Sequence, residues 1–242
     1  MERIKNSISV ITVCYNCKAD LELTIESVLS QTYNEVEFIV VDGASKDGTK
    51  DVLEKYRDRI DVCISEPDNG IYDAMNKGIA HSSGEWLIFM NAGDQFCDAD
   101  VLEKVFSSEL PQGVEFLYSD YYFHSKAYGT LLRRTDRNAG VVHHQSAIYK
   151  RALHDKYGYY VVTHPYIVSD LMFFLAIPAE KYFKVNVPIA IIEDAGVSAQ
   201  NWSRKQALCL KYIYGLVTFR YLLFDWLKMS VSTLLRKLHL RK

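Results

Sequence analysis

One stretch constrains the fold of this chain more than any other, residues 85–94, which read Glu-Trp-Leu-Ile-Phe-Met-Asn-Ala-Gly-Asp. An unbroken run of large apolar residues between a charge and a polar turn predicts a strand buried on both faces. Small and polar residues suited to a turn follow the run, and the turn ends on Asp94. Because open α/β sheets bind ligands at the carboxyl ends of central strands, this strand end is a candidate binding position.

Strand-like and helix-like segments alternate around this stretch. Strands are expected at residues 9–13, 36–41, 61–65, 86–90 and 114–118, with helices between them and a further helix at 98–106. Short links in such an alternation predict a right-handed, mostly parallel sheet with helices on both faces. The alternation fades after residue 120, where 131–134 and 141–148 are expected as mixed or edge strands and 165–177 as a helix.

Carboxylates follow several of the expected strands, namely Asp42, Asp68, Asp94 and Asp120. A single Asp at such a place is more often a helix cap or a turn residue. Several on one edge of a sheet would repel one another, and a divalent cation with a polar ligand would relieve that repulsion.

Asp170 stands in the expected helix 165–177, directly before the apolar run Leu171–Leu175. That position is poorly suited to a solvated surface charge. Two interpretations remain open from the residues alone: a cap or buried pair, or a base held in a cleft.

The composition, 49% hydrophobic and 24% charged, is that of a folded soluble protein. Its charge is unevenly distributed, because residues 203–242 hold nine of the 28 Lys and Arg residues and a single acid, Asp225. This asymmetry predicts a main domain over 1–200 and a basic, apolar helical extension over 201–242.

Five irregularly spaced cysteines and the lack of a secretory signal before the first expected strand favour a reducing, cytoplasmic compartment. Cys14 and Cys17 have the spacing of a redox motif. No other part of a thioredoxin pattern and no second pair for zinc accompanies them, so chance placement is favoured.

Residues 206–227 are apolar on nearly every helical face, yet Lys211, Arg220 and Asp225 interrupt them before the length of a membrane span is reached. Two interpretations stay open. The helices pack on the main domain, or they lie in the interface of an anionic membrane, at the inner face of the plasma membrane. Nucleic acid is a weaker explanation of the charge, because no recognition motif is present.

Several motifs occur in a fixed order: SVITVCYN at 9–16, ESVLSQTY at 26–33, VVDGASKDGT at 40–49, and GIYDAMNKGI at 70–79. Together they resemble the inverting glycosyltransferases of family 2, over about residues 7–195. The resemblance implies the GT-A fold, a Rossmann-like α/β fold with a mostly parallel sheet that binds a nucleotide sugar. A helical C-terminal tail would be added to it.

The resemblance implies a site for the nucleotide sugar at the strand ends and in one helix. Its residues would be Val13, Tyr15, Asp42, Asp68, Asn76, Asn91, Ala92, Gly93 and His144. Tyr15 would lie against the base, Asp42 would accept hydrogen bonds from the base or ribose, and Asp68 and Asn76 would complete the pocket floor.

By the same resemblance, Asp94 would hold Mg²⁺ or Mn²⁺ against the donor diphosphate. His144 would approach the pyrophosphate or the metal, and Asp170 would be the base that activates the acceptor.

Two positions depart from the family pattern. The usual Asp-x-Asp metal motif keeps only its last acid here, at Asp94, so weak affinity for free metal is expected and strict metal dependence is left open. Gly43 replaces the second acid of the nucleotide loop, which implies the loss of one base or ribose contact.

The expected function is therefore transfer of a hexosyl group, with inversion, from a nucleotide-diphospho-sugar to a hydroxyl of a glycan in cell-surface polysaccharide biosynthesis. A UDP-sugar is the favoured donor and a lipid-linked glycan the favoured acceptor. Two alternatives remain: a non-catalytic nucleotide-sugar-binding protein, motivated by the reduced acid motif, and a nucleotidyltransferase, which would usually carry a glycine-rich basic loop near its N-terminus. The residues do not specify the donor sugar, the linkage or the oligomeric state.

Overall fold

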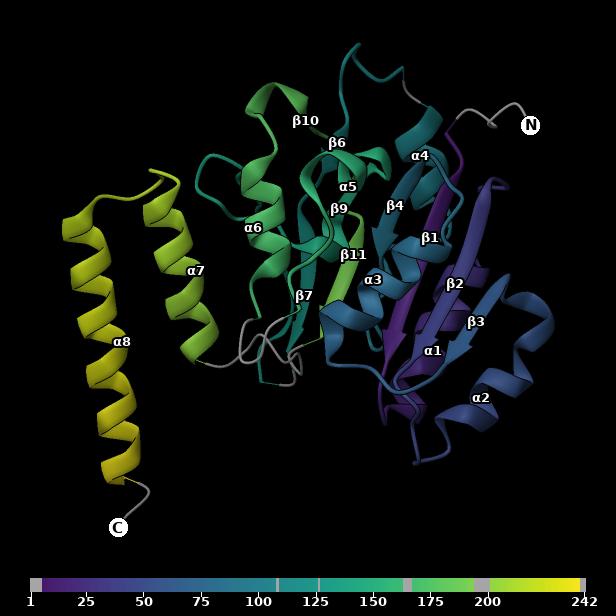
Figure 1. Cartoon of the computed structure of the whole chain (residues 1–242), viewed down its shortest axis with the longest axis horizontal. Helices are drawn as coiled ribbons and strands as arrows, with labels where there is room; N and C mark the ends of the chain where they lie inside the picture. Colours follow the sequence, from purple (N-terminus) through teal and green to yellow (C-terminus); the bar gives the residue numbers. More distant parts are fainter. Residues whose placement is uncertain (1–5, 108, 126, 163–166, 194–200, 240–242) are drawn as a thin grey trace.

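The computed structural model describes residues 6–107, 109–125, 127–162, 167–193 and 201–239. These residues form a layered α/β fold with two sheets, and two C-terminal helices lie side by side at one end of it (Figure 1). The predicted α/β fold with a helical C-terminal tail is therefore confirmed.

The strands are β1 (Ile8–Cys14), β2 (Val36–Asp42), β3 (Val62–Ser65), β4 (Trp86–Phe89), β5 (Gln95–Phe96), β6 (Phe116–Tyr118), β7 (Tyr121–Ser125), β8 (Gly129–Arg133), β9 (Ala147–Lys150), β10 (Tyr182–Lys184) and β11 (Ala190–Glu193). The helices are α1 (Lys18–Leu29), α2 (Thr49–Lys55), α3 (Ile71–His81), α4 (Val101–Ser107), α5 (Ala152–Tyr157), α6 (Ser169–Ala176), α7 (Asn201–Ile213) and α8 (Phe219–His239). Short 3-10 turns cover Arg57–Arg59, His144–Ser146 and Ala179–Lys181.

The larger sheet has the strand order β10-β6-β9-β4-β1-β2-β3. All its pairings are parallel except those of β9, which runs antiparallel to both β4 and β6. In register, Cys14 lies opposite Asp42, and Asp42 lies opposite Ser65. The carboxyl ends of β1, β2 and β3 are thus level with one another, which gathers their last residues on one edge.

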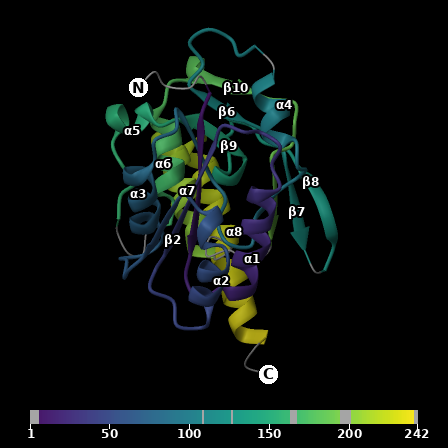
Figure 2. The same cartoon turned by 90° about the vertical axis from the view of Figure 1, so that its right-hand side faces the viewer.

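Helices cover both faces of this sheet, with α1, α2 and α4 on one side and α3, α5 and α6 on the other (Figure 2). Alternate residues of β1 point into the hydrophobic cores on the two faces of the sheet. Ile8 and Val10 pack in the core under α1 and α4, whereas Ile11 and Val13 pack in the core under α3 and α6. The apolar run of β4 is fully covered in the same way, as its sequence predicted.

The smaller sheet, ordered β5-β11-β7-β8, was not predicted as a separate sheet. Residues 131–134 were expected as a mixed or edge strand, and 131–133 form the end of β8, which is exposed along its whole length. Residues 121–125, for which no strand was expected, form β7 between β8 and β11. This sheet brings β11 close to the turn that follows β4, because β5 pairs with β11 directly after that turn.

Two expected elements differ from the structure. The helix expected at 165–177 begins at Ser169, and residues 163–166 lie outside the described part of the chain. The strand expected at 141–148 instead contains the 3-10 turn His144–Ser146, and β9 starts only at Ala147. Asp170 consequently lies in the first turn of α6, and not one turn inside a longer helix.

The C-terminal helix α7 packs against α6 and α8, and α8 forms the outer layer of this end of the molecule (Figure 1). Leu208 of α7 is buried, and Lys205 of α7 donates to Ser230 of α8 at 2.8 Å. None of the described helices combines the length and the apolar character needed to cross a bilayer. The predicted boundary after residue 200 adjoins 194–200, which lie outside the described residues, and the division into two parts stays a prediction.

Close packing of α3 on β1 makes Gly78 sensitive to substitution. A Cβ at Gly78 would overlap Cγ2 of Ile11, a fully buried β-branched side chain with little freedom to move. We expect Gly78→Ala to lower the free energy of unfolding by about 1–3 kcal/mol, despite the higher helix propensity of Ala. Urea unfolding measures this, with Ala80→Ser at an exposed position of α3 as control. Equal stability of the two variants would contradict the packing described here.

Candidate active site

Asp42, at the end of β2, has no exposed surface. Its carboxylate accepts hydrogen bonds from the backbone N–H and the hydroxyl of Ser45, and from the Ser65 hydroxyl at 2.7 Å. The Cys14 thiol lies 3.9 Å from Oδ1. In this structure Asp42 therefore holds the loop after β2 in place. The contact with base or ribose that was expected of it stays a prediction, and it requires a serine to move away.

Gly43 brings Asp68 and Tyr15 together. A Cβ at position 43 would overlap the Asp68 carboxylate and would lie 3.2 Å from the Tyr15 ring. The place where the family pattern has a second acid is thus filled by the acid of another loop. Asp68 is itself oriented by the Gly70 N–H at 2.8 Å, and Tyr15 is 65% exposed. These two side chains, and not Asp42, are the accessible groups at this edge.

Asn76 and Val13 support the site from within. The Asn76 amide donates to the Tyr160 carbonyl at 2.8 Å and accepts from the Tyr160 N–H at 3.0 Å, so it clamps the segment before α6 onto α3. Val13 is a core residue whose carbonyl accepts from the Ala92 N–H at 3.2 Å. The part that was expected of both in binding the nucleotide sugar stays a prediction.

The turn after β4 is fixed by Thr24 of α1, a fully buried residue. Its hydroxyl accepts from the Gly93 N–H at 2.9 Å and lies 2.8 Å from the Asp94 carbonyl and 3.2 Å from the Asn91 carbonyl. The Asp94 N–H closes the turn on the Asn91 carbonyl at 2.9 Å. The backbone of Asn91, Ala92, Gly93 and Asp94 is therefore held rigidly at the sheet edge.

The Asp94 side chain is 7% exposed, and its Oδ2 accepts from the Gln145 amide at 2.9 Å. The pKa of Asp94 is raised to about 6, chiefly by burial and to a smaller extent by the nearby Glu193 carboxylate. The hydrogen bonds from the Gln145 amide and from the backbone N–H of Glu193 oppose this rise only in part. Asp94 is thus a buried acid whose negative charge the protein leaves incompletely compensated.

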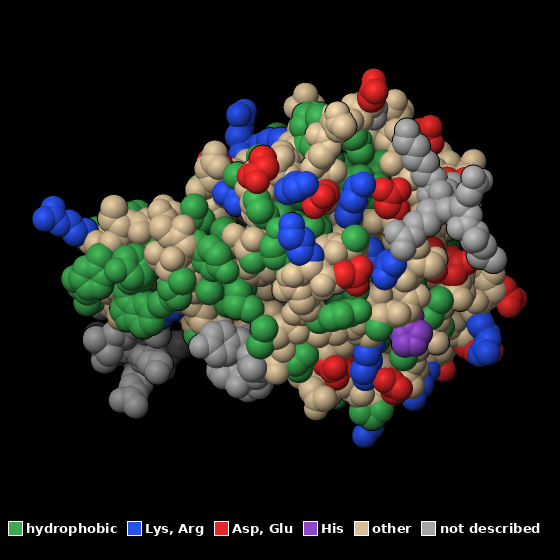
Figure 3. Space-filling view, turned by 45° about the horizontal axis from the view of Figure 1, so that its top comes forward, with side chains coloured by type: hydrophobic (Ala, Val, Ile, Leu, Met, Phe, Trp, Pro, Cys, Tyr) green, Lys and Arg blue, Asp and Glu red, His purple; other side chains and the backbone are tan. Residues whose placement is uncertain are grey.

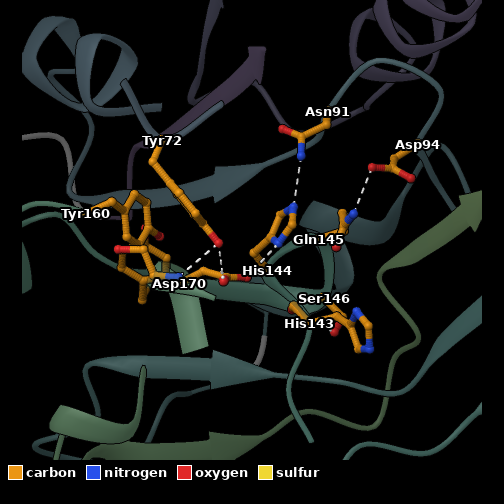
Figure 4. Close-up of polar contacts among 11 residues, drawn as sticks. Tyr72, Asn91, Asp94, His143, His144, Gln145, Ser146, Tyr160 and Asp170 are labelled. Atoms are coloured by element: carbon orange, nitrogen blue, oxygen red, sulfur yellow. Dashed lines mark hydrogen bonds and ion pairs between the residues drawn. The ribbon is translucent and has the colours of Figure 1, made fainter. Parts of the chain in front are cut away.

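Asp170 lies in a continuous chain of hydrogen bonds (Figure 4). Its Oδ2 is 3.0 Å from His144 Nδ1, and its Oδ1 accepts from the Tyr72 hydroxyl at 2.7 Å. His144 Nε2 lies 2.9 Å from the Asn91 amide nitrogen. Because a carboxylate only accepts and an amide N–H donates, this pattern fits neutral His144 with its proton on Nδ1.

Asp170 and His144 are each less than a fifth exposed, at 18% and 17%. Burial by itself would raise the pKa of Asp170, but the hydrogen bonds that His144 and the Tyr72 hydroxyl donate to the carboxylate outweigh it, so the pKa lies below its usual value. The carboxylate is therefore ionised at neutral pH. A bond from His144 to pyrophosphate or metal stays a prediction, since Asn91 and Asp170 engage both ring nitrogens in this structure.

Adjacent residues point to different parts of the site. His144 faces Asn91 and Asp170, Gln145 faces Asp94, and the His143 ring is directed away from both (Figure 4) and contacts Tyr121. Asp120, the remaining acid at a strand end, pairs with Lys184 at 2.6 Å and accepts from the Thr135 N–H. Its charge is neutralised locally, and it belongs to the scaffold.

The donor set around Asp94 is suited to a hard divalent cation. Within the described ranges no three His, Cys, Asp or Glu side chains cluster as metal ligands. However, the buried side-chain oxygens Gln145 Oε1 and Asn91 Oδ1 have no hydrogen-bond partner within these ranges. Gln145 Oε1 belongs to the same side-chain amide whose nitrogen donates to Asp94. Hard cations bind carboxylate and amide oxygens and keep several waters, so these residues fit Mg²⁺ or Mn²⁺ held jointly with a diphosphate.

Sequence reasoning missed Gln145, Tyr72 and Thr24. Gln145 directly follows His144, and Tyr72 lies within the GIYDAMNKGI motif, so both stood beside recognised residues. Nothing local to Thr24 indicated its contacts, because the turn that it fixes begins 67 residues later in the chain.

The mostly parallel sheet with helices on both faces, and its gathering of acids and amides at one edge, is the GT-A fold of nucleotide-sugar-dependent glycosyltransferases. A solved example is S. aureus TarS 1–349 in complex with UDP-GlcNAc, which matches with a TM-score of 0.67 over 84% of this chain and 66% of that chain. The two are 17% identical. The mannosyltransferase PcManGT from Pyrobaculum calidifontis, solved with GDP-Man and Mn²⁺, gives a TM-score of 0.66 over 87% of this chain and 64% of that chain at 18% identity.

Residues 9–108 match the model of the family described as Glycosyl transferase family 2. This match confirms, over residues 9–108, the resemblance to glycosyltransferase family 2 that the ordered motifs predicted. A curated relative is the UDP-Glc:alpha-D-GlcNAc-diphosphoundecaprenol beta-1,3-glucosyltransferase WfaP of Escherichia coli, 33% identical over 116 residues. That alignment covers 48% of this chain and 46% of WfaP, so the chain spans about half the length of this relative.

The incomplete compensation of Asp94 has a consequence for stability. Its folded pKa of about 6 lies above the value near 3.8 of an unperturbed Asp, so the wild-type protein loses stability as the pH rises between these values. Asp94→Asn keeps an acceptor for Gln145 and removes the charge. We expect it to stabilise the metal-free protein, with a gain about 1 kcal/mol larger at pH 7.5 than at pH 5.

Urea unfolding in EDTA at the two pH values measures this gain. Asp120→Asn is the control, since Asp120 pairs with Lys184 and its pKa is lowered, so its loss should destabilise the protein. A gain for Asp94→Asn that does not change with pH would contradict the assigned electrostatics.

Proposed function

We propose that this protein transfers a hexosyl group from a nucleotide-diphospho-sugar to a hydroxyl of a lipid-linked glycan, with inversion, in the biosynthesis of a cell-surface polysaccharide. One observation carries the proposal. The adjacent residues His144 and Gln145 contact the two acids with separate expected tasks, because His144 bonds to Asp170 and Gln145 bonds to Asp94. A donor-binding acid and a proton-accepting acid are thus coupled through two neighbouring side chains.

The donor part of the proposal rests on the edge formed by Tyr15, Asp68 and the turn that ends at Asp94. An exposed aromatic ring suits stacking on a base, and a carboxylate accepts from the N–H and O–H groups of a nucleoside. A UDP-sugar is the favoured donor, in keeping with the UDP-GlcNAc complex of TarS and the UDP-Glc named for WfaP. The GDP-Man complex of PcManGT supports a nucleotide sugar without deciding the base.

Asp94 and the side-chain amide oxygen of Gln145 would hold Mg²⁺ or Mn²⁺ with the donor diphosphate, as the Mn²⁺ of PcManGT suggests for this fold. Such a cation stabilises the negative charge that builds on the leaving nucleoside diphosphate. Thr24 contributes by keeping the turn that carries Asp94 rigid.

Asp170 would accept the proton of the acceptor hydroxyl as its oxygen attacks the anomeric carbon. The bond from that carbon to the diphosphate oxygen breaks as the new glycosidic bond forms, and in-line displacement inverts the configuration. Tyr72 and the His144 Nδ1–H fix both carboxylate oxygens and leave each a lone pair for the incoming proton. The β product named for WfaP agrees with this course.

The separate tasks of the two acids can be tested by substitution. We expect Asp170→Asn to bind the nucleotide sugar as wild type does and to transfer about 10²–10⁴-fold more slowly, because it lacks the base. Asp94→Ala should lose Mn²⁺-dependent donor binding and turnover together. A thermal-shift screen of nucleotide sugars with Mn²⁺ selects the donor, and calorimetry with a transfer assay then gives binding and rate for each variant.

Asp120→Asn removes a third acid at a strand end and should leave both quantities roughly unchanged, since Lys184 already neutralises Asp120. Equal transfer rates in wild type, Asp94→Ala and Asp170→Asn would overturn the assigned roles. A wild type that binds donor but turns over neither sugar nor nucleotide would favour the non-catalytic alternative.

A peripheral position at the cytoplasmic face of an anionic membrane is the second part of the proposal. Four apolar residues of α8 lie four positions apart on one face and are each 50–59% exposed: Phe219, Leu223, Leu227 and Val231. Hydrophobic side chains gather on the part of the molecule that α7 and α8 form, at the left of Figure 3. Together with the basic residues of the tail, this stripe suits insertion at the boundary of headgroups and acyl chains.

We expect the double substitution Leu223→Glu/Leu227→Glu to abolish sedimentation with anionic vesicles, because it places two charges at the centre of the stripe. Tyr128→Glu changes an 80%-exposed aromatic residue between β7 and β8 and should sediment as wild type does. Unchanged sedimentation of the α8 variant would remove the membrane proposal and leave the catalytic one intact.

A further inference from the structure

A groove of about 650 Å³ runs between α7, α8 and the residues that precede the 3-10 turn of His144. Its walls are amphipathic. Ala207, Leu216 and Met229 contribute apolar surface, and Arg204, Lys211 and Lys228 contribute three cations. Figure 1 shows the two helices antiparallel and side by side at the end of the molecule, outside α6. The volume is that of a site for a small molecule and is too small for a protein element.

Among the residues that the structure describes, three cations and one acid line this groove. Asp225 is the acid in its lining, and no ion pair joins it or any other acid of the described chain to Arg204, Lys211 or Lys228. Lys211 is partly buried, and burial lowers its pKa. A partly buried, unpaired ammonium group costs free energy that a bound anion would recover. The groove is therefore suited to a negatively charged ligand with an apolar part.

The groove is joined to the site through two short connections. Val141 lines it three residues before His144, and the neighbouring Gly140 is so close to α7 that a Cβ there would lie 3.2 Å from Lys211 Cε. On the other side, the Ile167 N–H donates to Gln206 of α7 at 3.2 Å, three residues before Asp170. A ligand in the groove would thus lie beside the segment that leads to His144, and against α7, whose Gln206 holds the segment that leads to Asp170.

We propose that this groove binds the phosphate or diphosphate group of the lipid-linked acceptor, with Arg204, Lys211 and Lys228 on the anion and the first units of the lipid chain on the apolar wall. The inference rests on the proposed function for the identity of the ligand. It adds the place where the acceptor is held, and it gives the basic charge of the tail a use beyond attraction to a membrane.

Farnesyl phosphate, below its aggregation concentration and without vesicles, is the probe for the full-length chain. We expect Lys228→Gln and Arg204→Gln each to weaken its binding at least fivefold, measured by calorimetry. Arg220→Gln removes the same charge from an exposed position of α8 outside the groove lining and should bind as wild type does. Farnesol and inorganic phosphate, which each carry half of the proposed ligand, should bind at least tenfold more weakly than farnesyl phosphate.

Ala207→Trp provides a second variant that fills the groove without changing charge, and it should also abolish binding of the probe. Equal weakening by Lys228→Gln and Arg220→Gln would overturn the proposal, because the binding would then reflect general surface charge. Inorganic phosphate binding as tightly as the probe would overturn the lipid assignment. A dimer that Ala207→Trp dissociates would make the groove an interface between copies and would also overturn it.

The same measurements separate this inference from the proposed function. Probe binding that depends on Lys228 in a protein without transferase activity would reject the function and leave the groove as a lipid-phosphate site. Transfer to a water-soluble acceptor, with probe binding that is insensitive to Lys228 and Arg204, would reject the groove and leave the function.

Discussion

The candidate site of this protein depends on how the surrounding residues compensate the negative charges of three largely buried carboxylates. Asp42 is saturated by serine donors, and Asp170 is held ionised by Tyr72 and His144. Asp94 receives one side-chain hydrogen bond, from Gln145, and its pKa is raised to about 6. All three are less than a fifth exposed, and they differ most in their hydrogen-bond partners. Asp94 has the least compensated negative charge of the three, so a bound cation would stabilise it most. Its burial lowers the stability of the unliganded fold, and a bound cation would remove that cost.

The turn His144–Ser146 connects Asp94 and Asp170 because it lies at the junction of the two sheets. β9 must run antiparallel between β4 and β6, so the chain enters the larger sheet at its carboxyl edge, directly after this turn. That entry places consecutive side chains beside Asp170 and Asp94, which are 76 positions apart in sequence. A change in the turn that carries Asp94 can therefore reach Asp170 through Asn91 and His144, whose contact closes the chain of hydrogen bonds.

The sequence predicted β1 to β4 and their helices because each strand is a short run rich in apolar and β-branched residues and each helix carries apolar residues at helical spacing. β8 was expected only in part, as a mixed or edge strand at 131–134, because all its residues are exposed and no burial pattern marks it. In the site, Asp94 and Asp170 stood out by their places beside apolar runs. The contacts of Thr24, Gln145 and Tyr72 could not be predicted, since each joins segments far apart in sequence and leaves no local periodicity.

The tail illustrates the same limit. An apolar helix interrupted by charges left packing on the domain and contact with a membrane as alternatives, but the structure gives the two helices different surroundings. Leu208 of α7 is buried, and Gln206 ties α7 to the segment before α6, whereas α8 leaves an apolar stripe exposed on its outer side. The interrupting charge Lys211 lines the groove, and Asp225 lies there too. Two of the three charges that break the apolar pattern along the chain are thus gathered in one groove, whereas Arg220 lies outside its lining, and a periodicity argument cannot distinguish them.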